Sequence, residues 1–179
     1  MNHQSVLTFW FEQLKPTQWF AVDERLDQQI KQQFSALLAQ AAAGELYSWR
    51  QNAQASLAEI ILLDQFSRNC FRGSAKAFAN DSLALCLAQH SVDKGYDQQL
   101  SVNQRAFIYM PYMHSESLLI HEQAERHFSQ TGLEKQYQFE LKHKQIIERF
   151  GRYPHRNQLL GRSSSPAELA FLAGPDSSF

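Results

Sequence analysis

The sequence predicts an all-α protein, and three observations support this fold class. Apolar residues recur at helical spacing between glycines, and long alternating runs of β-branched residues are absent. The hydrophobic fraction of 44% and the aromatic fraction of 12% are typical of a globular chain. We expect a single domain over residues 1–179, with about eight helices stacked as TPR-like hairpins.

Three helices are predicted in the first part of the chain. The first covers residues 3–14 and ends before Pro16. Asp23 is placed to cap a second helix that ends at Gly44, since glycine suits the left-handed residue just past a helix. The third, residues 54–68, is apolar nearly all round, which predicts a position in the middle of the domain.

The next two helices are predicted from a cap and a proline. Ser74 is a candidate N-cap for a helix over residues 75–94. Residues 100–113 form the following helix, which Pro111 kinks or ends.

Three more helices complete the prediction. Two cover residues 115–132 and 133–150. A short final helix begins at Ser165-Pro166-Ala167-Glu168, which has the pattern of a capping box with proline at the first helical position.

Composition excludes several classes of function. The net charge of -1 argues against a broad surface for nucleic acid, and no apolar run approaches the ~20 residues of a membrane span. The first residues lack the pattern of a signal peptide, so we expect a cytoplasmic protein. Cys70 and Cys86 lie among apolar residues and are expected to be reduced core thiols.

Two acids occupy helix faces that are otherwise apolar. Asp64 follows Ile60 and Ile61 at helical spacing, and burying a carboxylate there is costly unless it is paired. Arg68 is four residues further on, where the two side chains can meet. Asp81 lies on a similar apolar stripe. We expect both acids to orient arginines from behind a site.

Arginine is concentrated in two short segments, residues 63–74 and 149–163. They hold six of the ten arginines and none of the seven lysines, and each contains an Arg-Asn pair followed by glycine. Arginine offers a planar fork that binds carboxylate and phosphate with two hydrogen bonds. The candidate ligand-binding residues are therefore Arg68, Asn69, Arg72, Arg149, Arg152, Arg156, Asn157 and Arg162.

The second segment needs negative charge nearby. Gly151, Pro154 and Gly161 predict a shaped loop in which four arginines and a histidine have no acid between them. Because guanidinium groups repel one another, an anion must lie among them. Asp64, Asp81 and Glu116 are the internal candidates, and a bound anion is the external one.

Histidines beside these arginines are the candidate acid–base groups. His114 and Glu116 follow the proline of the fifth helix, and His155 lies within the second arginine segment. A structural role for His114 is the simpler interpretation, and a metal site needs more ligands than the pair provides. His121 and Glu125 are expected on a solvated helix face. No cofactor or metal is expected.

Aromatic residues near the start of the chain are expected in the core. They are Trp10, Phe11, Trp19, Phe20 and Trp49. The chain has no glycine-rich phosphate loop and no nucleophile elbow.

Several long motifs resemble a bacterial family catalogued as domain of unknown function 924. They lie at residues 62–74, 77–81, 105–116, 149–157 and 160–162, and the opening Val-Leu-Thr-Phe-Trp-Phe and the closing Phe-Leu-Ala…Ser-Ser-Phe match as well. Ser67 stands where the family usually has proline. The resemblance covers essentially the whole chain and implies an all-helical fold grouped with tetratricopeptide-like domains. It implies no established activity.

Three functional hypotheses follow. The first is a polar cleft that binds a small phosphate- or carboxylate-bearing ligand, with His114 or His155 as the acid or base if a reaction occurs. The second is a groove that grips an acidic peptide. The third is a purely structural arginine–aspartate network. The sequence leaves the ligand and the oligomeric state open.

Overall fold

The computed structural model describes residues 1–175 and 177, and every regular element in this part of the chain is helical. This confirms the predicted all-α class. The chain divides into an N-terminal unit (Met1–Arg72 with Lys76–Pro111) and a C-terminal unit (Gly73–Ala75 with Tyr112 onward), and each is described by itself. The single domain and the stacked hairpins stay predictions. The last residues of the family resemblance, 178 and 179, lie outside the described residues.

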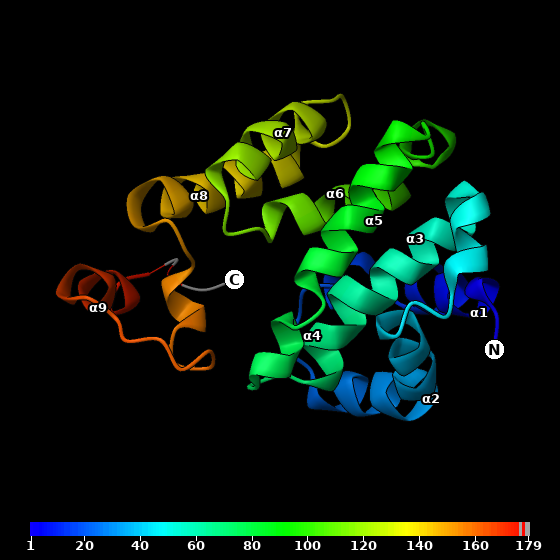
Figure 1. Cartoon of the computed structure of the whole chain (residues 1–179), viewed down its shortest axis with the longest axis horizontal. Coiled ribbons are helices and arrows are strands. Elements are labelled where there is room, and N and C mark those ends of the chain that lie inside the picture. The colour runs from blue at the N-terminus through cyan, green and yellow to red at the C-terminus, as the bar shows by residue number, and fades with distance from the viewer. Residues whose placement is uncertain (176, 178–179) are drawn as a thin grey trace. The chain divides into compact units, whose positions relative to one another are not determined.

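The N-terminal unit holds the first six α-helices (Figure 1). They are α1 (His3–Leu7), α2 (Glu24–Ala42), α3 (Ala53–Ile61), α4 (Ser67–Cys70), α5 (Asp81–Asp93) and α6 (Val102–Met113), the last of which ends in the C-terminal unit. Short 3-10 turns cover Pro16–Gln18, Tyr47–Gln51, Ala75–Phe78 and Asp97–Gln99. Two stretches are π-helical, Thr8–Gln13 and Leu62–Phe66.

Helix α3 is the centre of the N-terminal unit, as its apolar sequence predicted. It packs against α1 and α5, and its continuation as the π-helical turn packs against α2. Leu57, Ile60 and Ile61 are fully buried. Trp10 and Phe66 pack beside them with ring centroids 5.5 Å apart. Such aromatic pairs stabilise a core beyond the area they bury.

The C-terminal unit contains the remaining helices. They are α7 (Leu118–Phe128), α8 (Glu134–Phe150) and α9 (Pro166–Leu172), with a 3-10 turn at Pro154–Arg156. Helices α7 and α8 pack side by side (Figure 1), and α9 packs on the 3-10 turn. Ile146, Ile147 and Tyr153 form a buried apolar cluster between α8 and the segment that follows it.

Most predicted helix ends are confirmed. Asp23 caps α2 by accepting hydrogen bonds from the Arg25 and Leu26 amides, and Ser165 and Glu168 form the capping box of α9. Gly151 ends α8 with φ of 68°, a conformation that strains residues with a Cβ atom.

Other local predictions were wrong. Ser74 does not cap the fourth predicted helix, because α5 begins at Asp81 with Asn80 at the N-cap position and a 3-10 turn precedes it. Phe20 is 61% exposed instead of buried, and Cys86 is exposed while Cys70 is buried. Within the described residues, no helix combines the length and the apolarity that crossing a bilayer requires.

Candidate functional site

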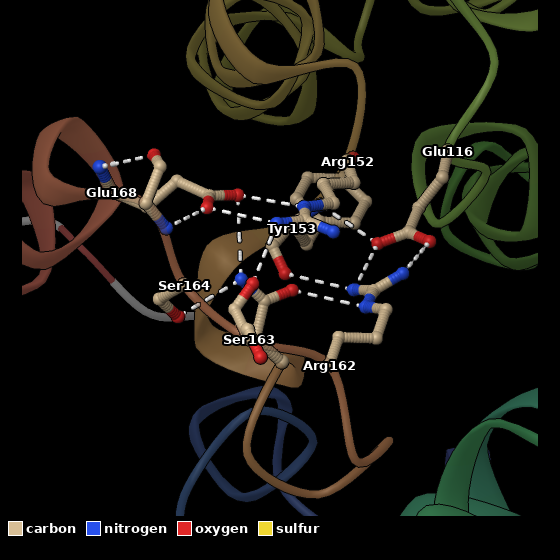
Figure 2. Close-up of polar contacts among 9 residues, drawn as sticks. Glu116, Arg152, Tyr153, Arg162, Ser163, Ser164 and Glu168 are labelled. Atoms are coloured by element: carbon tan, nitrogen blue, oxygen red, sulfur yellow. Dashed lines mark hydrogen bonds and ion pairs between the residues drawn. The ribbon is translucent and has the colours of Figure 1, made fainter.

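The segment after α8 carries Arg152, Arg156 and Arg162 on a folded loop of the C-terminal unit. Figure 2 shows Arg152 and Arg162. Arg162 forms two parallel hydrogen bonds with Glu116, from Nη1 to Oε2 at 2.6 Å and from Nη2 to Oε1 at 2.8 Å. Glu116 Oε1 also accepts the Tyr153 amide at 2.7 Å. Burial disfavours the charged form of Glu116, but Arg162 and this amide outweigh it and hold the pKa of that carboxyl below its usual range.

A second bidentate pair joins the same loop to α9. Arg152 donates from Nε and Nη2 to the two carboxylate oxygens of Glu168, at 2.7 and 2.9 Å. Nη2 also bonds the Ser163 carbonyl at 2.9 Å. The Arg152 guanidinium and the Ser165 amide hold the pKa of Glu168 far below its usual range. Glu168 is therefore both the capping-box residue of α9 and the acid that binds Arg152.

Asn157 connects the two pairs. It is fully buried, and its Oδ1 accepts from Arg162 Nε at 2.9 Å. Its amide nitrogen lies 3.3 Å from Glu168 Oε1 and 3.0 Å from Ser164 Oγ. The sequence predicted that negative charge must lie among these arginines, from Asp64, Asp81, Glu116 or a bound anion. Glu116 lies there, whereas Asp64 and Asp81 bind Arg68 in the N-terminal unit. The prediction missed Glu168, although the capping-box pattern had already singled out that residue.

Arg156 occupies a different environment in the same loop. It is 6% exposed, its Nη2 donates to the His114 carbonyl at 3.1 Å, and its guanidinium carbon lies 4.6 Å from the centre of the Tyr153 ring. The His155 ring lies beside the same tyrosine ring, with centroids 5.5 Å apart. The side chains of His155 and Arg156 thus meet at Tyr153, and Arg156 binds the backbone of His114. We call His114, His155 and Arg156 the His-Arg cluster.

Two more histidines surround Tyr153. The rings of His121 and His143 lie 6.2 and 5.7 Å from the tyrosine ring. Burial lowers the pKa of His143 to about 3. His143 Nδ1 bonds the Phe139 carbonyl at 2.7 Å. His143 is therefore neutral near pH 7.

The prediction of a solvated face for His121 was wrong. His121 is fully buried, and its Nδ1 lies 2.7 Å from Oε1 of Glu140, which is also fully buried. Glu125 is the more accessible member of the predicted pair and binds Lys144. His121 is buried because it lies on the face of α7 that packs on α8. No local signal in the sequence indicates which face of α7 is buried in this way.

The other predicted site residues lie in the N-terminal unit. Arg68 binds Asp64 at 3.1 Å and donates to both carboxylate oxygens of Asp81 at 3.0 and 3.1 Å. The contact that the i, i+4 spacing predicted is thus present. Asp64 is 1% exposed, and its Oδ2 also accepts from Gln65 at 2.6 Å. Asp64 and Gln65 lie on a π-helical turn, and such turns often occur at functional sites.

Arg72 and Asn69 share another carboxylate. Arg72 donates from Nε and Nη2 to Asp27 at 2.6 and 2.9 Å, and Asn69 donates to Asp27 Oδ1 at 2.8 Å. These bonds join α4 to the first turn of α2.

Arg149 lies apart from these networks at the end of α8. It is exposed, and its guanidinium carbon lies 4.7 Å from the Phe150 ring centre and 5.9 Å from that of Phe171. A direct role for each arginine in ligand binding stays a prediction, as does the meeting of residues 63–74 and 149–163 at one cleft. In the described residues, no group of three or more acids, histidines and cysteines is arranged to hold a metal ion.

A polar surface hollow elsewhere on the C-terminal unit contains none of the predicted site residues. It lies on α7 and α8 and is lined by Glu122, Glu125, Arg126, Ser129 and Tyr137. Its side chains bind one another, as in the contact of Tyr137 with Glu125.

Comparison with known proteins identifies the family. The model of the family described as "Bacterial protein of unknown function (DUF924)" matches residues 6–176. The chain belongs to this family. A solved structure, titled as a protein of unknown function from Agrobacterium tumefaciens, is 35% identical, and the match covers 95% of this chain and 96% of that one with a TM-score of 0.87. No curated protein matches this DUF924 chain significantly. The resemblance seen in its motifs is confirmed, and the family carries no assigned activity.

Proposed function

We propose that this DUF924 protein binds a small phosphate- or carboxylate-bearing molecule at the His-Arg cluster of the C-terminal unit. The observation that supports this proposal is the position of Arg156. Its guanidinium is held over the Tyr153 ring and against the His114 carbonyl, beside two half-buried histidines. A planar guanidinium fixed in this way is suited to two oxygens of a phosphate or carboxylate group, because its fork is oriented before the ligand arrives.

The bidentate pairs give the cluster a rigid support. Arg162 with Glu116 and Arg152 with Glu168 hold the loop on either side of Arg156. A binding group is effective when the surrounding contacts already fix its geometry. The proposal therefore divides the predicted arginines by role: Arg156 contacts the ligand, while Arg152 and Arg162 shape the loop.

A reaction at this site would use the two histidines. His114 and His155 are both half-buried. His155 precedes Arg156 in the sequence, and the His114 carbonyl accepts a hydrogen bond from Arg156. Either imidazole would be the acid or base, and Arg156 would stabilise negative charge that develops on the ligand.

A titration tests the proposal. We expect inorganic phosphate or succinate to raise the Tm of the wild-type chain, and the rise to be lost in Arg156→Lys, because lysine cannot stack and bind with a fork. Arg25→Lys is the matched control, since Arg25 is an exposed arginine of the N-terminal unit. The proposal fails if neither anion shifts the wild-type Tm, or if Arg156→Lys responds as the wild type does.

The structural-network hypothesis is the second candidate. It is favoured by the carboxylate partners of Arg68, Arg72, Arg152 and Arg162. It predicts that Arg156→Lys lowers the Tm in buffer, with no anion effect on either protein. The same titration therefore separates the two candidates.

A further inference from the structure

A buried hydrogen-bonded chain runs from α8 through α7 to the segment after α8. It consists of Glu140, His121 and Tyr153, all three fully buried. Glu140 Oε1 lies 2.7 Å from His121 Nδ1, and His121 Nε2 lies 3.1 Å from the Tyr153 hydroxyl. The anion site proposed above uses none of these polar groups directly.

Two partners show that His121 Nε2 carries a hydrogen. The Ser115 carbonyl oxygen lies 2.9 Å from Nε2 and can only accept. The Tyr153 hydroxyl donates its hydrogen to the Met113 carbonyl, so its oxygen can only accept from Nε2. Both contacts require an Nε2–H donor.

A proton must also lie between the remaining nitrogen and Glu140. At 2.7 Å, two lone pairs would repel, so either Nδ1 or the carboxyl oxygen holds a hydrogen. The pair is then an imidazolium with a carboxylate or a neutral imidazole with a carboxylic acid. Both forms have a net charge of zero, and they differ only in the position of one proton.

We infer that Glu140 is a neutral carboxylic acid that donates its proton to Nδ1 of a neutral His121, and that this pair fixes the turn carrying His114. Glu140 Oε2 is buried and has no hydrogen-bond partner among the described residues. A carboxylate would leave part of its charge on that oxygen without a donor, which is costly in the interior.

The charged surroundings favour the same form. Arg156 already places a positive charge on the ring of Tyr153, whose hydroxyl contacts His121. In the ionic form of the pair, the His121 imidazolium would place a second positive charge beside Tyr153. The other titratable groups near the pair are Glu125 on α7, His143 and Lys144 on α8, and His114 and His155 on the flanking segments. Glu125 and Lys144 bind each other, and burial raises the pKa of Glu140 despite His121 and Lys144.

The turn that carries His114 has three successive backbone carbonyl groups that accept hydrogen bonds from side chains. Tyr153 binds the Met113 oxygen, Arg156 binds the His114 oxygen and His121 binds the Ser115 oxygen. Glu140 therefore helps to position the backbone that carries His114 through His121, which binds the Ser115 carbonyl directly. This last step rests on the proposed anion site, whereas the position of the proton does not.

Long-range 1H–15N spectra of the full chain test the inference without any ligand. At pH 7 we expect His121 to show a protonated Nε2 and an unprotonated Nδ1. His90, on α5 of the other unit, provides the comparison histidine in the same sample. The inference is wrong if His121 shows two protonated nitrogens or an unprotonated Nε2.

A pair of variants gives a second measurement. Glu140→Gln retains an N–H donor for Nδ1, whereas Glu140→Val removes it and leaves Nδ1 buried without a partner. We expect the Tm loss of the glutamine variant to be clearly smaller, with the NMR signature of His121 retained. Equal losses would contradict a neutral donor at this position. If the NMR result holds but phosphate and succinate bind to no variant, the anion site fails and the proton assignment stands.

Discussion

Arg162 and Glu116 lie 46 positions apart and meet in two parallel hydrogen bonds of 2.6 and 2.8 Å. The same carboxylate accepts the Tyr153 amide, and Arg162 also bonds the Tyr153 carbonyl at 3.2 Å. One ion pair therefore satisfies both backbone polar groups of Tyr153, the residue around which the His-Arg cluster is built. This contact determines where the cluster lies relative to the turn that begins α7.

Replacing Arg162 by lysine should destabilise the C-terminal unit although the charge is kept. Lysine cannot reproduce the fork, so we expect a loss of roughly 1–2 kcal/mol in the free energy of unfolding, limited by the partial exposure of both side chains. Urea unfolding followed by circular dichroism measures the loss. Arg126→Lys, at an exposed position on α7, is the control. Equal midpoints for the two variants would show that the fork is not needed.

Removing the cation between Asp64 and Asp81 should destabilise the N-terminal unit more strongly. Arg68→Gln leaves Asp64, which is 1% exposed, without its i+4 guanidinium, and breaking such a buried pair costs about 3 kcal/mol. Thermal unfolding of Arg68→Gln measures this effect.

A compensating variant supplies the control for Arg68. In Arg68→Gln combined with Asp64→Asn, the buried charge is removed together with its partner, so part of the stability should return. If the double variant is less stable than the wild type by the sum of the two single losses, the two side chains are not coupled.

Acid should destabilise the C-terminal unit through His143. Its folded pKa of about 3 lies below the ordinary value of 6.5, so its stabilising contribution is complete above pH 6.5 and is lost as the pH falls toward 3. Between pH 7 and pH 4 this loss amounts to about 3 kcal/mol. Unfolding free energies measured across this range should change less in His143→Asn, whose amide can still donate to the Phe139 carbonyl.

A histidine of the other unit provides the comparison for this pH profile. His90→Gln, on α5, leaves His143 unchanged and should therefore retain the acid sensitivity that His143 contributes. An unchanged profile in His143→Asn would show that His143 is not the group that binds the proton.

The two cysteines should react at different rates. Cys86 is exposed, whereas Cys70 is buried and its burial raises the pKa of the thiol to about 11. Because the thiolate is the reactive form, iodoacetamide at pH 8 should modify Cys86 rapidly and Cys70 only after unfolding. Mass spectrometry of the wild type and of Cys86→Ser follows the reaction. Fast labelling of native Cys86→Ser would contradict the burial of Cys70.

Local sequence patterns predicted the parts of the fold that neighbouring residues control. Asp23 and the Ser165–Glu168 capping box mark helix starts because their side chains bond amides two or three residues away. Ser74 shows the limit of such reasoning, since an extra 3-10 turn moved the start of α5 to Asp81.

The candidate site was predicted only in part for the same reason. The sequence identified the arginines and three acids that bind arginines, Asp64, Asp81 and Glu116, and it explained why negative charge is needed. It could not identify Glu168 as the partner of Arg152 or place His121 beside Glu140, because those contacts cross between helices.

The sequence by itself determined the helical class, most helix ends and the Asp64–Arg68 contact, since each depends on residues within about one helical turn. Tertiary structure decided which carboxylate neutralises which distant guanidinium and which histidines are buried around Tyr153. Those outcomes depend on which faces of α7, α8 and α9 pack against neighbouring elements. The burial of whole apolar stripes determines these faces, and no single polar residue does so.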